Sequence, residues 1–361
     1  MSTNEQTVRS QRCALPLVEL ASGVDSLYVS GRCDLATDLL ADLELSKLEA
    51  LEHGGSIPYA FGGYDWQLKA SALHRYRYRL DHPLVTLGLT PSDKLPALFA
   101  QFRSEGIHSL GADGVVHWLR TALGNADLSP TLQVSRIDLH ADWQNWTLTG
   151  DHRHRFVCRS RDLTTYEDDF ELTGFSFGNR KTKTLTARIY DKTREIDGNG
   201  HDWWHAIWGD DYIDGLPVLR TEFEFARAAL NDMDLSDPTE TIANVDRLWA
   251  YATQQWLTYR KASRHSCAHR WPIAPEWEQI QNATLAGDAI PMDRITAGRR
   301  TGELRRLMPG LNGYVAGFAS WTGHDTIGDA CAALPEHLQA YERTSRRSFC
   351  SRVTEKRDAR Q

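Results

Sequence analysis

Two kinds of hydrophobic period alternate along the chain, and together they predict a mixed α and β fold. Apolar residues recur at helical spacing over residues 34–54, whereas residues 131–144 alternate between apolar and polar side chains, as a half-buried strand does. We expect further strands at 24–33, 57–70, 74–89, 154–166, 169–178 and 185–196, a strand running into a helix at 216–230, and helices at 92–106, 113–124, 201–209 and 239–260.

The order of these elements recurs, which predicts an α+β fold of two related mixed α/β halves. Each half would be an antiparallel sheet flanked by helices, and a helical C-terminal region would follow. The expected divisions are a polar N-terminal tail (1–14), an N-terminal α+β half (15–128), a second α+β half (129–235), a helical C-terminal region (236–335) and a basic tail (336–361).

The composition is that of an ordinary globular protein, with 361 residues, 41% of them hydrophobic and 25% charged. No run of about 18 apolar residues is present, so no membrane span is expected. The first twenty residues lack the apolar core of a signal peptide, and the six cysteines form no CxxC pair. These features favour a reduced, cytoplasmic location.

Charge is distributed unevenly along the chain. The net charge of −7 argues against indiscriminate binding to polyanions. Six basic residues nevertheless stand against one acid within residues 180–194, and seven more lie within residues 343–360. A basic segment in an acidic protein indicates one localised anionic partner, and solvated charge runs are the alternative.

Three of the predicted strands have unusual polar faces. Since successive side chains of a strand point to opposite sides, each strand collects its charged residues on one face. These residues are Arg136, Asp138, His140 and Asp142 in the first strand, Arg188, Tyr190 and Lys192 in the second, and Arg220, Glu222 and Glu224 in the third. If the strands are neighbours with aligned faces, acids, cations and a tyrosine converge on one surface.

Such a surface suits a hard metal ion and a phosphodiester, because Mg²⁺ and Mn²⁺ prefer carboxylate and water oxygens. A strand rises ~3.3 Å per residue, so Asp138 and Asp142 stand about 13 Å apart and cannot share one ion. We therefore expect Asp138 to lie opposite Glu222 as the ligand pair. Asp191 would join them only if its strand ended at Tyr190. A solvent-facing sheet would alternate in the same way, and that interpretation stays open.

The three segments RIDLHAD (136–142), FSFGNRKTKTLTARIYDK (175–192) and LRTEFEFAR (219–227) occur in an order that resembles the signature of Rep-trans type rolling-circle replication initiators. These proteins serve some plasmids, integrative elements and filamentous phages. The chain length and the Trp-rich region after the last motif look most like the filamentous-phage members. The resemblance covers roughly residues 130–230, so the second half is the expected catalytic half.

The resemblance implies a DNA-nicking tyrosine on a strand, metal-binding acids and recognition of an origin hairpin. Tyr190 matches the nucleophile, with Arg188 and Lys192 as its catalytic cations. The expected metal ligands come from Asp138, Asp142, Asp191, Glu222 and Glu224, and the expected DNA contacts are Arg136, Arg180, Lys181, Lys183, Arg220 and Arg227. Asn179 stands where a serine is common in the family, so its role differs from the pattern.

The implied function is a rolling-circle DNA replication initiator that nicks one origin strand through a 5′-phosphotyrosine, with Mg²⁺ or Mn²⁺ as the only cofactor, and leaves a 3′-hydroxyl primer. Tyrosine is a weak nucleophile because its ordinary pKa is near 10, and we expect Arg188, Lys192 and the metal to favour the phenolate.

The implied partner is origin DNA, single-stranded or folded as a hairpin, in the cytoplasm of a bacterial host. A host helicase and polymerase are further candidate partners, and oligomerisation is left open. The alternative function is a sequence-specific DNA-binding protein or regulator that does not cleave. A metal-dependent nuclease that uses water is a more distant alternative.

Overall fold

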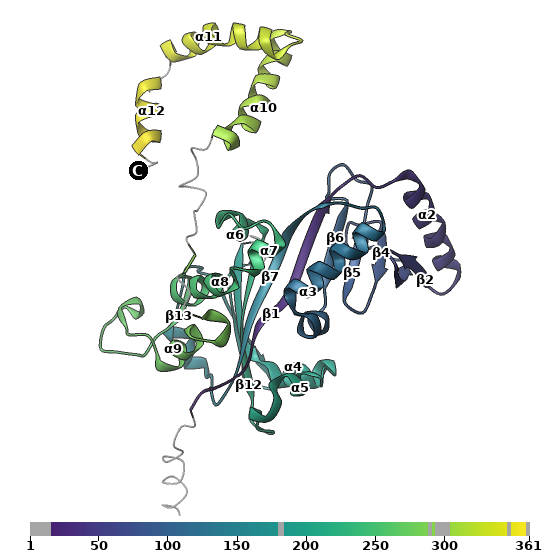
Figure 1. The fold of residues 1–361 in the computed structure, drawn as a ribbon. Helices are drawn as coiled ribbons and strands as arrows, with labels where there is room; N and C mark the ends of the chain where they lie inside the picture. The colour runs from purple at the N-terminus through teal and green to yellow at the C-terminus, as the bar shows by residue number, and fades with distance from the viewer. Residues whose placement is uncertain (1–15, 180–183, 288–290, 293–303, 345–347, 359–361) are drawn as a thin grey trace, which may run out of the picture. The chain divides into compact units, whose positions relative to one another are not determined.

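The computed structural model describes residues 16–179, 184–287, 291–292, 304–344 and 348–358 (Figure 1). The chain divides into two compact units, Met1–Asp293 and Arg294–Gln361. None of the helices in the described part of the chain is long and apolar enough to cross a membrane.

The first unit is built on one antiparallel sheet of eleven strands in the order β2-β3-β4-β5-β6-β1-β7-β12-β11-β10-β9. The strands are β1 (Val18–Arg32), β2 (Ser56–Phe61), β3 (Tyr64–Lys69), β4 (Tyr78–Asp81), β5 (Val85–Leu89), β6 (Leu98–Phe102), β7 (Thr131–Gln144), β9 (Leu163–Asp168), β10 (Glu171–Phe177), β11 (Leu185–Asp191) and β12 (Val218–Ala226). The α+β class is therefore confirmed. The expected halves share one continuous sheet, and a relationship between them stays a prediction.

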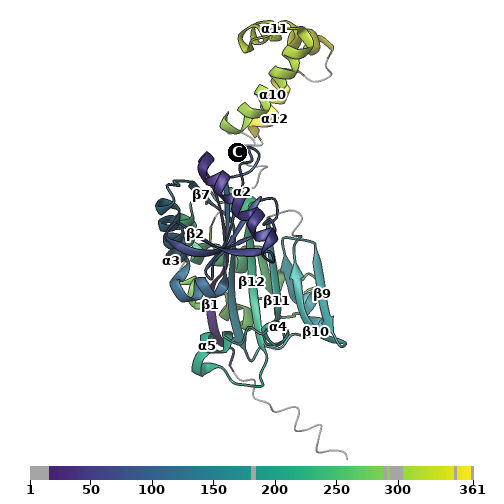
Figure 2. The ribbon, with the colours of Figure 1, turned by 90° about the vertical axis from the view of Figure 1, so that its right-hand side faces the viewer.

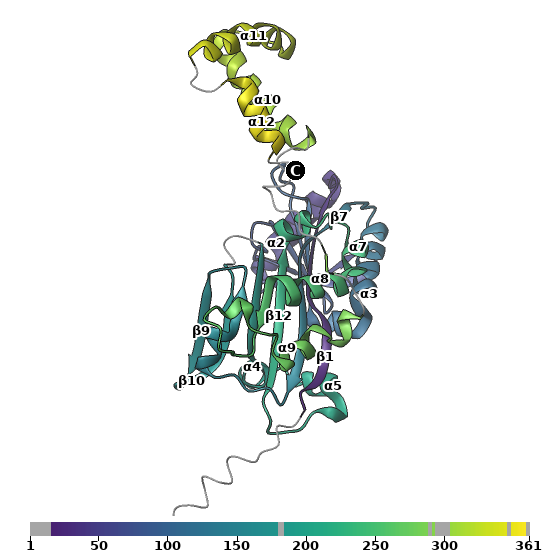
Figure 3. The same ribbon diagram turned by 90° about the vertical axis from the view of Figure 1, so that its left-hand side faces the viewer.

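The α-helices of this unit alternate with the strands along the chain or follow the last strand of the sheet. They are α2 (Thr37–Glu52), α3 (Ser104–Asn125), α4 (Lys192–Asn199), α5 (Trp204–Trp208), α6 (Arg227–Asp232), α7 (Pro238–Ile242), α8 (Val245–Tyr251) and α9 (Pro275–Gln281). Figure 3 shows α8 and α9 in front of the sheet. In the opposite view of Figure 2, β9 to β12 lie open and α4 and α5 lie at their lower end.

The hydrophobic core lies on the side of the sheet that α8 and α9 cover. Leu139 of β7, Phe223 of β12 and Ile189 of β11 are completely buried there. The Phe223 ring meets Trp249 of α8 edge-on, with ring centroids 5.3 Å apart. Because side chains alternate along a strand, the residues directly before and after Leu139, Phe223 and Ile189 in their own strands point to the opposite, polar face.

The pairing of β1 with its two neighbours, β7 and β6, is irregular near Asp25. The pairing of β1 with β7 shifts register between Val24 and Ser26, which leaves Asp25 as an extra residue. Such a bulge redirects one side chain. In addition, β6 pairs only with Leu27–Gly31 of β1, so the first part of β1 has no strand on that side. The N-terminus of α3 lies there, and the Ser104 hydroxyl donates to the Asp25 carbonyl at 2.9 Å.

Two expected helices are wrong. Residues 92–106 contain β6, because Leu98, Ala100 and Phe102 alternate into the core. Residues 239–260 are not one helix but α7, α8, a π-helical turn (Ala252–Trp256) and β13 (Leu257–Tyr259). The strand β13 pairs with β8 (Phe156–Cys158), and this tertiary contact overrides the helical pattern of residues 257–259.

The second unit consists of α10 (Leu304–Thr322), α11 (Ile327–Thr344) and α12 (Phe349–Asp358). The Phe318 ring of α10 meets the His337 ring of α11 edge-on, with centroids 5.0 Å apart. The expected boundary at position 336 falls within α11, and the division into a helical region and a basic tail stays a prediction.

Candidate active site and metal centre

The register of three neighbouring strands aligns their polar faces. From β11 through β12 to β7, the rows are Tyr190–Arg220–Asp142, Arg188–Glu222–His140 and Thr186–Glu224–Asp138. Glu224, not Glu222, therefore lies opposite Asp138, so the expected cross-strand pair was displaced by two residues. The residues Asp138, His140, Asp142, Arg220 and Glu222 are at most 2% exposed. This burial excludes the solvent-facing interpretation.

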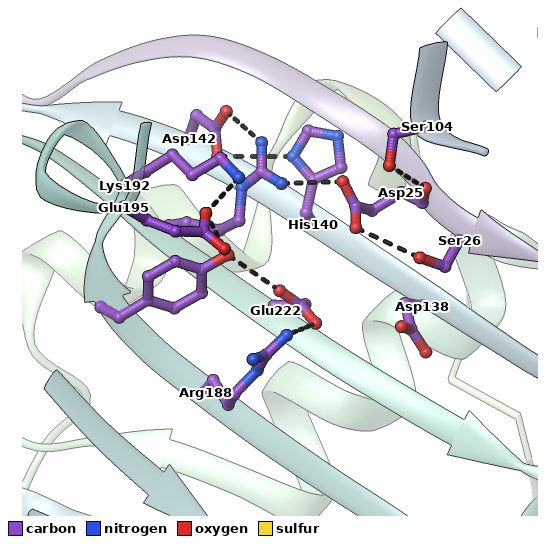
Figure 4. Close-up of polar contacts among 12 residues, drawn as sticks. Asp25, Ser26, Ser104, Asp138, His140, Asp142, Arg188, Lys192, Glu195 and Glu222 are labelled. Atoms are coloured by element: carbon purple, nitrogen blue, oxygen red, sulfur yellow. Dashed lines mark hydrogen bonds and ion pairs between the residues drawn. The ribbon is translucent and has the colours of Figure 1, made fainter. Parts of the chain in front are cut away.

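Tyr190 lies among carboxylates and cations, and Figure 4 labels the carboxylates Glu222 and Glu195 and the cations Arg188 and Lys192. Its hydroxyl donates to Glu222 at 3.2 Å and lies 3.5 Å from the Glu195 carboxylate. Arg188 donates to the other Glu222 oxygen at 2.5 Å, and Lys192 forms an ion pair with Glu195. The tyrosine hydroxyl thus has two carboxylate acceptors, each of which is held in place by a cation.

Lys192 reaches this group from a helix and not from the strand. The strand β11 ends at Asp191, and Lys192 begins α4. Asp191 is the N-cap of α4 and accepts from the Arg194 backbone N–H at 3.1 Å, as capping aspartates do. The expectation that Lys192 continues the polar face of β11 is therefore wrong, although its side chain is buried beside Glu195. Asp191 is engaged in capping and lies apart from the other expected ligands.

The surroundings of Tyr190 oppose the phenolate in the absence of a metal. Burial and the Glu222 carboxylate raise the pKa of Tyr190 well above its ordinary value, against the smaller opposite effects of Arg220 and Arg188. Arg188 lowers the pKa of Tyr190, as expected, but burial and Glu222 outweigh it, and the expected contribution of a metal stays a prediction. A tyrosine in this environment needs a proton acceptor, and Glu222 and Glu195 lie in position to be one.

Two of the expected metal ligands, Asp138 and Glu224, share the arginine Arg136. Arg136 forms a forked ion pair with Asp138 and contacts Glu224 at 3.1 Å. Burial, opposed by Arg136, raises the pKa of Asp138 to about 7. Because Arg136 occupies both carboxylates, this pair is better described as an ion-pair cluster than as an open metal site.

Asp142 and Arg220 form the buried centre of the face. Arg220 donates to both Asp142 oxygens at 2.6 and 2.8 Å and to Asp25 at 2.8 Å, and its guanidinium lies 4.0 Å from the Trp204 ring centroid. Burial acts to raise the pKa of Asp142, but Arg220 and His140 hold it well below its ordinary value. Arg220 is 0% exposed, so the expected contact between Arg220 and DNA is wrong for this conformation, and Asp142 has no free oxygen for a metal.

A different set of residues could hold a metal ion. Ligand atoms of Asp25, His108 and His140 all lie within 4.8 Å of one another. They come from the β1 bulge, from α3 and from β7. The Nε2 atoms of His108 and His140 are buried and have no hydrogen-bond partner among the residues that the structure describes. Two unpartnered imidazole nitrogens beside a carboxylate fit a divalent metal ion.

The orientation of His140 and the neutral form of His108 also suit metal binding. The Nδ1 atom of His140 lies 3.4 Å from Asp142, and a proton shared there leaves Nε2 with a lone pair. Burial and the neighbouring His140 lower the pKa of His108 to about 4, so His108 is neutral at neutral pH. Metal ligation requires this neutral form.

Acidification should therefore destabilise the metal-free protein through His108. The unfolded chain protonates His108 near pH 6.5 and the folded chain near pH 4, so stability is complete above pH 6.5 and falls as the pH drops to 4. We expect His108→Gln to reduce this loss when urea unfolding is measured in EDTA between pH 7 and 4. The control is His53→Gln at the exposed end of α2. An unchanged pH dependence in His108→Gln would contradict the assignment.

Tyr190 also lines an open cleft of about 770 Å³ at the β9–β11 end of the sheet. Its lining includes Arg188, Arg194 and Glu195, together with Tyr166 and Thr164 of the edge strand β9. The candidate nucleophile is thus next to a space that can admit a substrate.

The expected DNA contacts differ in their accessibility. Arg180, Lys181 and Lys183 lie outside the described residues. The Arg136 side chain is 24% exposed above the Tyr28 ring. Arg227 is half-buried and donates to Gln133, Ser30 and Ser135.

No protein-family model and no curated protein matches this chain. The chain is similar to a solved structure described as a rolling circle replication initiator protein from Geobacillus stearothermophilus. The identity is 14%, the TM-score is 0.46, and the match covers 77% of this chain and 99% of that chain.

Sequence reasoning missed two of the three candidate metal ligands and undervalued the third. His140 was visible on the alternating face of β7, but it was not selected because hard-metal sites favour carboxylates. Asp25 gave no signal, since its direction depends on a bulge. His108 belongs to a helix whose contact with β7 depends on where β6 ends.

Proposed function

We propose that the protein is a rolling-circle DNA replication initiator, which nicks one strand at an origin through a tyrosine nucleophile. The observation that supports this best is the placement of Tyr190, whose hydroxyl donates to Glu222 beside a substrate-sized cleft. The three sequence motifs that resemble such initiators lie on adjacent strands and bring their charged residues to the same face.

The reaction follows from these contacts. The Tyr190 oxygen attacks a backbone phosphorus while its proton passes to the Glu222 carboxylate, which accepts its hydrogen bond. The bond from phosphorus to the 3′-oxygen breaks, the 3′-oxygen leaves as a hydroxyl after protonation, and the 5′-phosphate remains on Tyr190. Arg188 holds Glu222 in position and supplies positive charge for the phosphate. The phosphotyrosine preserves a reactive ester, so a later 3′-hydroxyl can reverse the step.

Asp25, His108 and His140 would hold the metal ion of this reaction, and the ion would act as a Lewis acid for the phosphate. Imidazole ligands suit transition metals, whereas Mg²⁺ prefers oxygen ligands. Of the two expected ions, this ligand set therefore favours Mn²⁺ over Mg²⁺. Asp142 orients His140, and Asp138 and Glu224 stabilise Arg136.

The decisive experiment is to trap the covalent product. The protein is incubated with Mn²⁺ and a labelled pool of single-stranded DNA, and adducts that survive SDS are mapped by mass spectrometry. We expect a nucleotide on Tyr190. Binding without an adduct would favour the non-cleaving DNA-binding alternative. Cleavage without an adduct would favour the water-dependent nuclease.

Metal binding should be measurable without activity. Mn²⁺ at about 100 times its Kd should stabilise the fold by about 2.7 kcal/mol. This stabilisation is measured as an increase in the thermal unfolding temperature on addition of Mn²⁺. We expect His108→Ala and His140→Ala to lose this increase, whereas His53→Ala keeps it. Asp138→Asn should also keep it, which separates this ligand set from the acids that the sequence indicated. Loss of the increase in Asp138→Asn alone would place the ion at the Arg136 cluster instead.

A further inference from the structure

Tyr166 is an exposed aromatic residue on the edge strand β9, and the proposed reaction does not use it. Its side chain is 51% exposed and lines the same cleft as Tyr190. The strands β9, β10 and β11 lie side by side at this edge of the sheet (Figure 2).

The register places Tyr166 and Tyr190 in one row with a glycine between them. Gly174 of β10 pairs with Tyr166 on one side and with Tyr190 on the other. A Cβ atom at Gly174 would lie 2.8 Å from the Tyr190 Cβ, so the close approach of β11 requires glycine. The two tyrosines therefore stand on the walls of a slot whose floor has no side chain.

The width of this slot suits one flat ring. Two strand spacings separate the backbones of Tyr166 and Tyr190 by about 9.6 Å. A ring in van der Waals contact on both faces needs about 7 Å, twice the usual separation of carbon atoms. A planar aromatic group can therefore enter between the two side chains.

The charges of the cleft favour a nucleobase over a phosphate in this slot. The lining contains the acids Asp162, Asp168, Asp191 and Glu195 against the cations Arg188 and Arg194. An acidic lining repels phosphate, but carboxylates accept hydrogen bonds from base amino groups. The hydroxyls of Thr164 and Ser176 can donate or accept in the same row as Arg188.

We propose that Tyr166 stacks on a nucleobase of single-stranded DNA adjacent to the phosphate that Tyr190 attacks. This inference rests on the proposed function for its substrate. The base lies above Gly174, and the backbone passes the Arg188 side of the cleft. Stacking is tolerant of sequence because every base has an aromatic face, so Tyr166 positions the strand and does not read the origin.

The test measures stacking directly in EDTA, where no cleavage intervenes. The probes are single-stranded dT dodecamers with one 2-aminopurine at successive positions, whose fluorescence is quenched when the base stacks. We expect quenching at one position with the wild-type protein. Tyr166→Ala should abolish this quenching and weaken binding about 5- to 150-fold, whereas Tyr166→Phe should preserve both.

A matched control lies on the same hairpin. Phe170 is 98% exposed at the turn between β9 and β10 and does not line the cleft, so Phe170→Ala should behave as wild type. Circular dichroism checks that Tyr166→Ala is folded. Unchanged quenching in folded Tyr166→Ala, or no quenching with wild type at any position, would overturn the inference.

The covalent assay separates this inference from the proposed function. Wild-type adduct formation together with unchanged quenching in Tyr166→Ala rejects the stacking site and keeps the nicking function. Quenching that depends on Tyr166 without any adduct rejects the nicking function and keeps the stacking site.

Discussion

Tyr190→Phe should eliminate covalent DNA adducts and reduce nicking by at least about 10⁴-fold, because the substitution removes the nucleophile and with it the covalent route. The other tyrosine of the cleft, Tyr166, lies on the edge strand β9 and is two strands away from Tyr190, so we do not expect it to replace the nucleophile. The Tyr190 hydroxyl is the group next to the cleft that donates to Glu222, and the Arg188 guanidinium on the same strand is engaged with that carboxylate.

The same substitution should leave the fold intact. Tyr190→Phe removes one hydrogen bond, at about 0.5–1.5 kcal/mol, while Glu222 keeps Arg188 and Glu195 keeps Lys192. Urea unfolding and DNA affinity measure these effects beside the adduct assay. Tyr251→Phe is the control, since its ring lies in the core and its hydroxyl accepts from Arg159 at 3.3 Å. Undiminished nicking by purified Tyr190→Phe would reject Tyr190 as the nucleophile.

The contacts of Glu222 favour a role as proton acceptor over a role as metal ligand. Its carboxylate accepts from both Tyr190 and Arg188, and it lies opposite His140 in the register. The high pKa of Tyr190 follows from burial and from this carboxylate, so the group that opposes the phenolate is also the one that can remove its proton. The sequence indicated both residues but assigned Glu222 to the metal.

Period-two alternation predicted which residues of β7, β11 and β12 share the polar face of the sheet. The expected strand at 131–144 matches β7, and the polar residues of β7, β11 and β12 share one side of the sheet. Alternation within one strand is a local property, so a sequence can show it. The acids and cations were therefore found together, even though their pairing across strands was displaced.

The remaining features depend on contacts between distant segments. Asp25 points toward Arg220 because a bulge interrupts the pairing of β1 with β7. His108 reaches His140 because the pairing of β6 with β1 ends at Leu27 of β1, which leaves the edge of β1 before Leu27 free for α3. No local pattern encodes either event. The end of β11 did have a local signal, because aspartate is a favoured N-cap residue and Asp191 caps α4. The sequence prediction instead followed the apparent alternation through Lys192 and extended the strand too far.

Arg220→Met should destabilise the fold by about 3–5 kcal/mol, because it leaves two carboxylates without their cation in a buried site. Arg220 is 0% exposed and is the ion-pair partner of both Asp142 and Asp25. Urea unfolding at pH 7 measures the loss. The control is Arg77→Met, which breaks a solvent-exposed pair with Glu44 and should change the unfolding free energy little.

The pH dependence of the difference in unfolding free energy between Arg220→Met and the wild type tests whether an unpaired Asp142 carboxylate causes the loss. In the wild type, Arg220 holds the pKa of Asp142 well below its ordinary value, against the effect of burial, so Asp142 stabilises the fold above pH 4 and loses this effect only in stronger acid. In Arg220→Met, burial without the cation should raise the pKa of Asp142 above its unfolded value. The folded variant then binds more protons than the unfolded chain, and its deficit relative to wild type should narrow as the pH falls from 7 to 5. A constant deficit over this range would mean that lost packing against Trp204, and not an unpaired carboxylate, destabilises the variant.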